Sequence, residues 1–159
     1  DASFVRPAEI EYFIENTVRV ARTGGDVAIF LPTSSSYGEV FSLLWEVLFN
    51  EDLAEHGAAV ENLIAEIPTV SHIEAIAQRA GIVNINTQTA IEVFEFENGE
   101  EFIASPLVAD FLMPVWLEML DDEEKERAVK QLAQLIDTED GTLSFRFAVK
   151  ATLLTGEKG

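Results

Sequence analysis

The stretch Val18-Arg-Val-Ala-Arg-Thr-Gly-Gly-Asp-Val-Ala-Ile-Phe-Leu-Pro32 decides the fold of this chain. The apolar spacing over residues 8–22 predicts an amphipathic helix. The pair Gly24-Gly25 predicts its end, because glycine readily adopts the left-handed backbone that terminates helices. Residues 26–31 form a nearly continuous apolar run, which is typical of a strand buried on both faces, and Pro32 is expected to end it. The stretch therefore predicts a helix that turns sharply into a buried strand.

Helices and strands alternate along the rest of the chain. Ser36–Glu39 and Ser71–Glu74 have the spacing of capping boxes and predict two helix starts, while Pro114 is expected to kink or split a later helix. Further helices are predicted over about 58–66, 105–120 and 121–136, and extended segments over about 82–97 and 143–155. This order predicts a single α/β domain over residues 1–159, with a helical segment at about 98–140.

The composition excludes several classes of protein. With 29 acidic and 10 basic residues the net charge is -19, which opposes binding to nucleic acids and to anionic membranes. The absence of cysteine excludes disulfides, thiolate metal sites and cysteine nucleophiles. No apolar run reaches the roughly 18 residues of a membrane span and no secretory signal is visible, so a cytoplasmic location is expected. Asp1 in place of a methionine predicts a processed chain or one cut from a longer protein.

The quoted stretch resembles a segment of class I S-adenosylmethionine-dependent methyltransferases. In that family a helix ends in an Arg-Val-Leu-(Lys/Arg)-Pro-Gly-Gly pattern and leads into the fifth strand of the sheet; here Ala21 and Thr23 replace the usual Leu and Pro. Ala80-Gly81-Ile82 resembles the start of the sixth strand, Phe145–Thr155 the antiparallel seventh strand, and Phe94–Leu120 an insert that some members carry between them. The resemblance implies an α/β fold with a partial Rossmann-like sheet made of the family's last three strands, in which the seventh lies between the fifth and the sixth.

The motif that binds the cofactor in this family is missing from the sequence. Family members hold S-adenosylmethionine with a glycine-rich loop after the first strand and an acidic residue that ends the second, and this chain has no Gly-x-Gly pattern. The resemblance therefore implies the C-terminal, acceptor-side half of a methyltransferase, inactive alone, with residues 1–5 as the tail of the fourth strand. S-adenosylmethionine would be the cofactor of the full-length family, and none is expected to bind this chain alone. The alternative is a non-catalytic ligand-binding or dimerisation module derived from the same fold.

The loop after the first strand holds the candidate site. In open α/β sheets ligands bind beyond the carboxyl ends of the strands, so Thr33, Ser34 and Tyr37 are candidates to line a pocket for a small apolar methyl acceptor. The competing interpretation is a connector whose side chains cap the next helix. The two histidines, His56 and His72, are expected to be exposed or to cap helices, and the sequence has no metal-ligand spacing. No residue is assigned a catalytic role.

Large aromatic side chains recur on the predicted helical stripes and strands. Trp45 and Trp116 each lie on an apolar stripe, and both are expected to be largely buried. The wider aromatic set could shape an apolar acceptor site, although packing in the core is favoured. This set consists of Trp45, Phe49, Phe94, Phe96, Phe102, Phe111 and Trp116.

The edge of the predicted strand at 26–31 indicates a need for a partner. In the family the fifth strand pairs with the fourth, which is largely absent here. Unpaired N–H and C=O groups beside an apolar run that has no Lys and no internal Pro pair readily with another chain. A homodimer is therefore expected, or a missing N-terminal half that supplies the neighbouring strand. The alternative is that residues 1–22 fold over this edge.

Overall fold

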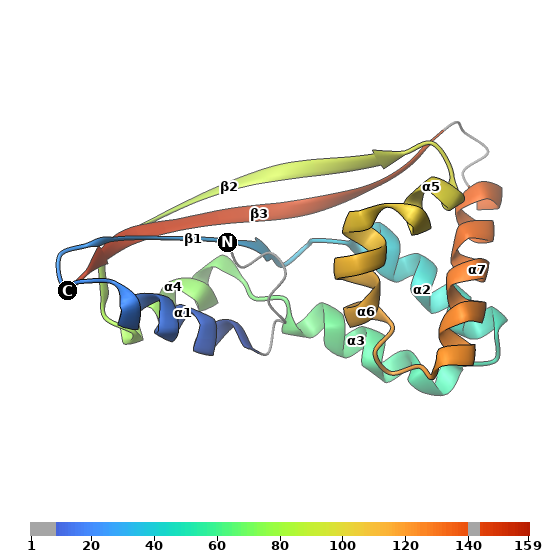
Figure 1. Cartoon of the computed structure of the whole chain (residues 1–159), viewed down its shortest axis with the longest axis horizontal. Helices are drawn as coiled ribbons and strands as arrows, with labels where there is room; N and C mark the ends of the chain where they lie inside the picture. The colour runs from blue at the N-terminus through green and yellow to red at the C-terminus, as the bar shows by residue number, and fades with distance from the viewer. Residues whose placement is uncertain (1–8, 140–143) are drawn as a thin grey trace. The chain divides into compact units, whose positions relative to one another are not determined.

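The computed structural model describes residues 9–139 and 144–159. It has a mixed α/β fold in which helices flank a three-stranded antiparallel sheet (Figure 1). The predicted tail of a fourth strand at residues 1–5 lies outside the described residues. In chain order the elements are α1 (Ile10–Val20), β1 (Asp26–Thr33), α2 (Gly38–Asn50), η2 (Ala54–His56), α3 (Gly57–Glu66), α4 (Val70–Arg79), β2 (Ile82–Phe96), α5 (Gly99–Ala104), η3 (Leu107–Leu112), α6 (Met113–Trp116), α7 (Asp122–Glu139) and β3 (Phe145–Lys158).

The described residues form two compact units. The first contains residues 9–36, 65–92 and 149–159, and the second contains residues 37–64, 93–139 and 144–148. Strand β1 lies wholly in the first unit, whereas β2 and β3 contribute residues to both. A helical segment is predicted at about 98–140. Its described residues contain the helices α5, η3, α6 and α7. That the chain behaves as one domain stays a prediction.

Strand β3 lies between β1 and β2, so the last strand of the chain forms the centre of the sheet. β1 and β3 run antiparallel, with Asp26 opposite Glu157 and Thr33 opposite Lys150. β2 also runs antiparallel to β3 (Figure 1). Strands β1 and β2 therefore point in the same direction on either side of β3.

The core of the first unit lies between the sheet and the helices α1 and α4. Alternate residues of β1 are buried in this core, while Ala28 and Phe30 on the opposite face are exposed. The expectation of a strand buried on both faces is therefore wrong. Pro32 does not end the strand, which continues to Thr33, because Pro32 stays in register opposite Ala151 of β3. The core cluster consists of Ile10, Ile14, Val18, Val27, Ile29, Leu31, Ile73, Ile76, Ala77, Ile82 and Leu154.

The Gly24-Gly25 turn has the backbone that the sequence predicts. Gly24 has a φ of +73°, and its N–H donates to the carbonyl of Lys158 at 2.8 Å. A Cβ on Gly25 would lie 2.9 Å from the carbonyl oxygen of Arg22, closer than side chains normally approach. Lys158 also donates from Nζ to the carbonyl of Ala21, just after α1, at 2.8 Å. The last strand thus fixes both the end of α1 and the start of β1.

In the second unit, α2 and α5 both pack against α7. A reciprocal capping box precedes α7: the N–H of Asp121 donates to Oε2 of Glu124 at 2.9 Å, and the N–H of Glu124 donates to Oδ1 of Asp121 at 2.8 Å. The helical segment before α7 changes from the π-helix η3, which ends at Leu112, to the α-helix α6, which starts at Met113, and Pro114 lies in the first turn of α6. The predicted kink or split at Pro114 stays a prediction. Over residues 9–139 and 144–159, none of the helices is both long and apolar enough to cross a membrane.

The two capping boxes predicted from serine spacing are wrong. Helix α2 begins at Gly38 with Tyr37, not Ser36, as its N-cap residue. Helix α4 begins at Val70, and the side chain of Thr69 caps it. Spacing identifies residues that are able to cap a helix, whereas the tertiary structure decides which of them is used.

Candidate functional site

The three residues predicted to line an acceptor pocket follow one another closely after β1. Thr33 is the last residue of β1, Ser34 lies in the turn after it, and Tyr37 is the N-cap residue of α2. Thr33 is 1% exposed and Ser34 is half-buried. Thr33 and Ser34 belong to the first unit and Tyr37 to the second, so the structure does not bring all three together within one unit.

A chain of three threonine hydroxyl groups crosses the sheet at Thr33; Thr33 and Thr152 are buried, and Thr89 is exposed. Thr33 Oγ1 donates to the carbonyl of Lys150 at 2.9 Å and lies 2.9 Å from Oγ1 of Thr152, which in turn lies 2.9 Å from Oγ1 of Thr89. Each hydroxyl carries one proton. Because the proton of Thr33 is given to Lys150, Thr152 must donate to Thr33 and Thr89 must donate to Thr152. The hydroxyl of Thr33 is thus fully used inside the sheet.

Ser36 extends this network along the loop. Its hydroxyl donates to the carbonyl of Thr33 at 2.6 Å and accepts the N–H of Lys150 at 2.9 Å. Ser36 is 4% exposed, and the N–H of Ser34 donates to the carbonyl of Pro68 at 2.9 Å. The loop is therefore held by backbone and hydroxyl contacts. Sequence reasoning missed Ser36 and Thr152 as parts of this network, and a threonine within an apolar strand was the one available signal.

Tyr37 packs among aromatic rings of the second unit. Its ring centre lies 5.4 Å from that of Trp116, 5.8 Å from that of Phe147 and 6.0 Å from that of Phe41. Burial raises the pKa of Tyr37 to about 12, because the charged phenolate loses its hydration. Its φ of +63° is rare for a bulky side chain. The phenol stays neutral near pH 7 and can donate a hydrogen bond there, but it does not act as a base.

The aromatic set divides between the core and the surface. Trp116 is 3% exposed, which confirms its predicted burial, whereas Trp45 is 39% exposed and its predicted burial is wrong. The ring of Trp45 lies against Gly57 at the start of α3, and this contact covers the side chain only in part. Of the rest of the set, the buried members are Phe96 and Phe102, and the exposed members are Phe49, Phe94 and Phe111.

The two histidines do not form a site in the described residues. His56 is half-buried, with Nε2 3.9 Å from carboxylate oxygens of both Glu55 and Glu124. His72 is exposed, and only its backbone N–H takes part in the cap of α4. Throughout residues 9–139 and 144–159, no group of three or more His, Asp and Glu side chains is placed to hold a metal ion.

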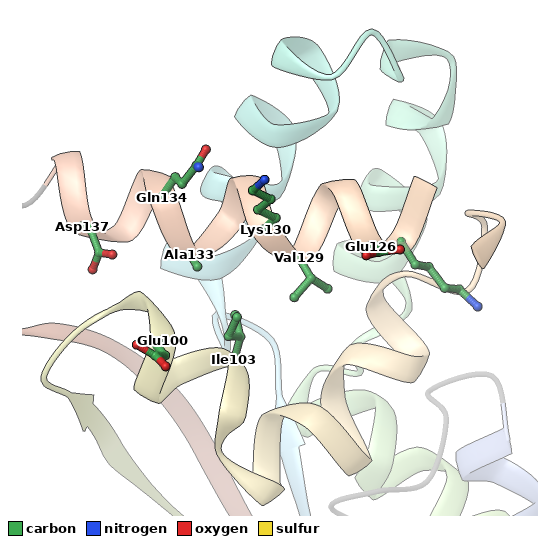
Figure 2. A pocket seen from close by; sticks show the side chains of 9 residues that line it. Glu100, Ile103, Glu126, Val129, Lys130, Ala133, Gln134 and Asp137 are labelled. Atoms are coloured by element: carbon green, nitrogen blue, oxygen red, sulfur yellow. The ribbon is translucent and has the colours of Figure 1, made fainter. Parts of the chain in front are cut away.

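A groove that the sequence does not predict lies between α5 and α7 (Figure 2). Its volume is about 620 Å³. Ile103 from α5 and Val129 and Ala133 from α7 point into the space between the two helices. Asp137, at one end, accepts the N–H of Gly99 at 2.8 Å and so holds α5 against α7. The groove offers apolar contacts with a charged rim. The rim consists of Glu100, Lys125, Glu126, Lys130, Gln134 and Asp137.

Comparison with known proteins gives similarity only at the level of structure. No family model and no curated protein matches the sequence. A proposed methyltransferase of Bacillus halodurans C-125 is 12% identical with a TM-score of 0.43, and this chain covers 63% of it. Phosphoethanolamine N-methyltransferase 2 of Haemonchus contortus, in complex with phosphomonomethylethanolamine and S-adenosylhomocysteine, is 13% identical with a TM-score of 0.40. The YcgJ protein of Bacillus subtilis is 9% identical with a TM-score of 0.44.

The three matches include at least 96% of this chain but only part of each solved structure. This chain covers 31% of the Haemonchus contortus structure and 61% of the YcgJ structure. Similarity at these identities and TM-scores is too low to transfer a function to this chain.

Proposed function

We propose that this chain is the acceptor-side, C-terminal half of a Rossmann-like S-adenosylmethionine-dependent methyltransferase fold and is inactive alone. The observation that carries the proposal is the strand order, in which the last strand, β3, lies antiparallel between β1 and β2. The resemblance implies this order for the family's fifth, seventh and sixth strands. The Gly24-Gly25 turn supports the same assignment, because it joins α1 to β1 where the family joins a helix to its fifth strand.

The described residues do not fit a cofactor site for S-adenosylmethionine. Such a site needs a glycine-rich loop that follows a strand and opens a helix. The connection from β1 to α2 contains no glycine, α2 starts with the single Gly38, and the helix after β2 starts with the single Gly99. Gly99 lies directly against the backbone of Ala133 in α7, so helix packing accounts for it. Cofactor binding is therefore assigned to a missing N-terminal half, which would also supply the strand beside β1.

The acceptor side is proposed at Thr33 and Ser34 in the first unit, because open α/β sheets bind ligands beyond the carboxyl ends of their strands. Tyr37 belongs to the second unit and stays a separate candidate. Thr33 would be a positioning residue, because its hydroxyl is already hydrogen-bonded to the Lys150 carbonyl and to the hydroxyl of Thr152. Ser34 is half-buried and is the member of the three whose side chain is best placed for contact with a ligand. The acceptor is proposed to be small and apolar.

Calorimetric titration of the chain with S-adenosylmethionine tests the first part of this proposal. We expect no saturable binding of S-adenosylmethionine. S-adenosylhomocysteine serves as a matched second ligand, and we expect no saturable binding of it either. Saturable binding of either compound at micromolar concentration would contradict the assignment of the cofactor site to another segment.

The reading frame upstream of the Asp1 codon tests the second part. We expect it to encode a strand, a glycine-rich loop and a helix, and we expect the extended protein to bind S-adenosylmethionine while the 159-residue chain does not. An upstream frame without these elements would favour the alternative, a non-catalytic ligand-binding or dimerisation module. The two titrations use the same conditions, so the difference between them reports on the added segment.

A further inference from the structure

The sheet has two outer strands, and they differ in how well they can pair with another chain. Within residues 9–139 and 144–159, β1 and β2 each pair with β3 alone. The N–H of Lys158 donates to the carbonyl of Gly25, so Gly25 faces β3. Alternation along an antiparallel pair then directs the backbone groups of Ala28, Phe30 and Pro32 away from β3. Pro32 has no N–H to offer at that outer edge, which limits strand pairing there.

Strand β2 has no comparable protection over residues 85–92. The chain has no charged residue between Arg79 and Glu92, although 25% of the whole sequence is charged. Edge strands are normally protected by lysines, prolines or bulges. The nearest distortion of β2 is Asn84, with a φ of +54°, and it precedes this segment. Residues 85–92 are therefore a regular, nearly neutral edge within the first unit.

Most side chains of this segment are exposed, and Ile85 and Thr87 are half-buried. Thr87 and Thr89 face α4 and Thr152 through their hydroxyl contacts. Ile91 is next on that face of the strand and is 71% exposed. An isoleucine this exposed on an outer strand gains apolar contact when another strand is added beside it.

We propose that β2 pairs over residues 85–92 with the same strand of a second copy of this chain. A two-fold axis makes the two strands antiparallel, so the six strands form one continuous sheet. In a pair centred on Gln88, Ile91 lies opposite Ile85 of the partner subunit and Glu92 lies opposite Asn84 of the partner subunit, so the acidic residues of the two copies stay apart. A cationic peptide is disfavoured as the occupant, because residues 85–91 offer it no acidic side chain. The like net charges of the copies are screened beyond about 8 Å at physiological salt.

Sedimentation equilibrium of the whole chain, from micromolar to high micromolar concentration, tests the proposal. We expect a monomer–dimer equilibrium that Ile91→Lys weakens at least tenfold, because two added lysines then lie at the shared edge. Val20→Lys is the matched control: Val20 is 73% exposed on α1, and the change in charge is the same. Val20→Lys should leave the dimer intact. A chain that stays monomeric at every concentration, or a dimer that Ile91→Lys does not weaken, would overturn the proposal.

A third variant separates the two edges of the sheet. Ile29 cannot report on the edge of β1, because it is 1% exposed in the core and a lysine there would unfold the unit. Phe30 is 39% exposed, so Phe30→Lys is the suitable change on β1. We expect this variant to dimerise like the unmodified chain. Loss of the dimer in Phe30→Lys but not in Ile91→Lys would place the interface on β1 instead.

Amide hydrogen exchange gives an independent readout. In the dimer, every second amide of residues 85–92 should exchange more slowly than in Ile91→Lys at the same concentration, because only the outward N–H groups gain partners. A dimer without this alternating protection would use another surface and would overturn the proposal. Because none of these measurements involves a cofactor, their outcome is separate from that of the proposed function.

Discussion

At the scale of single residues, the direction of the hydroxyl chain predicts unequal costs for equal changes. Thr33→Val should be the most destabilising, by about 1–3 kcal/mol, because it leaves the buried hydroxyl of Thr152 without an acceptor and removes a donor to the Lys150 carbonyl. Thr152→Val should cost about 1 kcal/mol, and Thr89→Val, at the exposed end, less than about 0.5 kcal/mol. Urea denaturation of the three isosteric variants measures the order, and a Thr89→Val cost equal to that of Thr33→Val would refute it.

The buried phenol of Tyr37 predicts a loss of stability at high pH. Its pKa is raised from 10.0 to about 12 in the folded chain, so the unfolded chain releases this proton first. The stabilisation is fully present below pH 10 and is lost as the pH rises towards 12, in total by about 2–3 kcal/mol. Tyr37→Phe should lack this part of the pH dependence. In a Tyr12→Phe background the phenolate absorbance reports on Tyr37 alone, and titration of that absorbance near pH 10 would contradict the burial.

Trp45 and Trp116 show what a sequence pattern can and cannot predict about single residues. Both lie on apolar helical stripes, and the pattern correctly identifies the stripe. Whether a stripe is covered depends on what packs against it. Trp116 meets Tyr37 and Phe41, whereas the ring of Trp45 meets the start of α3 at Gly57. The pattern alone contains no information on these distant contacts.

At the scale of elements, the turn between α1 and β1 predicts a strong dependence on glycine. Gly24→Ala should destabilise the chain by about 1–2 kcal/mol, because alanine is strained at a φ of +73°. Gly24→Asn is the matched control and should lose less, since asparagine tolerates the left-handed region. Chemical denaturation measures both variants. Equal losses in the two would show that space in the turn, rather than its backbone conformation, requires glycine.

A second change to an element concerns the end of α1. Lys158 donates from Nζ to the carbonyl of Ala21, and that nitrogen lies 3.4 Å from the carbonyl of Arg19. Lys158→Met keeps most of the aliphatic length but removes the donor, and it should cost about 1 kcal/mol. Lys150→Met is the control, because it also removes one positive charge from β3. If both variants lose the same stability, the effect comes from net charge and not from the contact at α1.

The elements themselves follow from the sequence more closely than their arrangement does. The Gly24-Gly25 pair and the apolar run after it predict the end of α1 and the position of β1. The position of β3 in the centre of the sheet depends on pairing between residues far apart in the chain, so periodicity cannot reveal it. The sequence also does not settle which residues cap the helices. The hydroxyl of Ser36 accepts the N–H of Lys150 in β3 instead of capping α2, whereas Asp121 and Glu124 do cap α7. The groove between α5 and α7 likewise arises only when the two helices pack.

At the scale of the whole molecule, the excess of acidic residues predicts that salt stabilises the folded chain. The net charge of -19 makes the compact state repel itself, and salt screens this repulsion. We expect the midpoint of thermal unfolding to rise with sodium chloride by a few degrees, where ~1 kcal/mol corresponds to about 2–4 °C for a chain of this size. Sodium chloride and potassium chloride should act equally, since screening depends on ionic strength.

A charge variant distinguishes screening from specific binding of ions. Glu61 and Glu66 lie on α3 and are exposed, and changing both to lysine moves the net charge from -19 to -15, because each change adds two charges. If self-repulsion is the cause, this variant should be more stable at low salt and should gain less when salt is added. Its unfolding midpoint should approach that of the unmodified chain at high salt, where the extra charge no longer matters. A salt response that is unchanged in the variant would mean that ions act at particular sites on the chain rather than by screening its net charge.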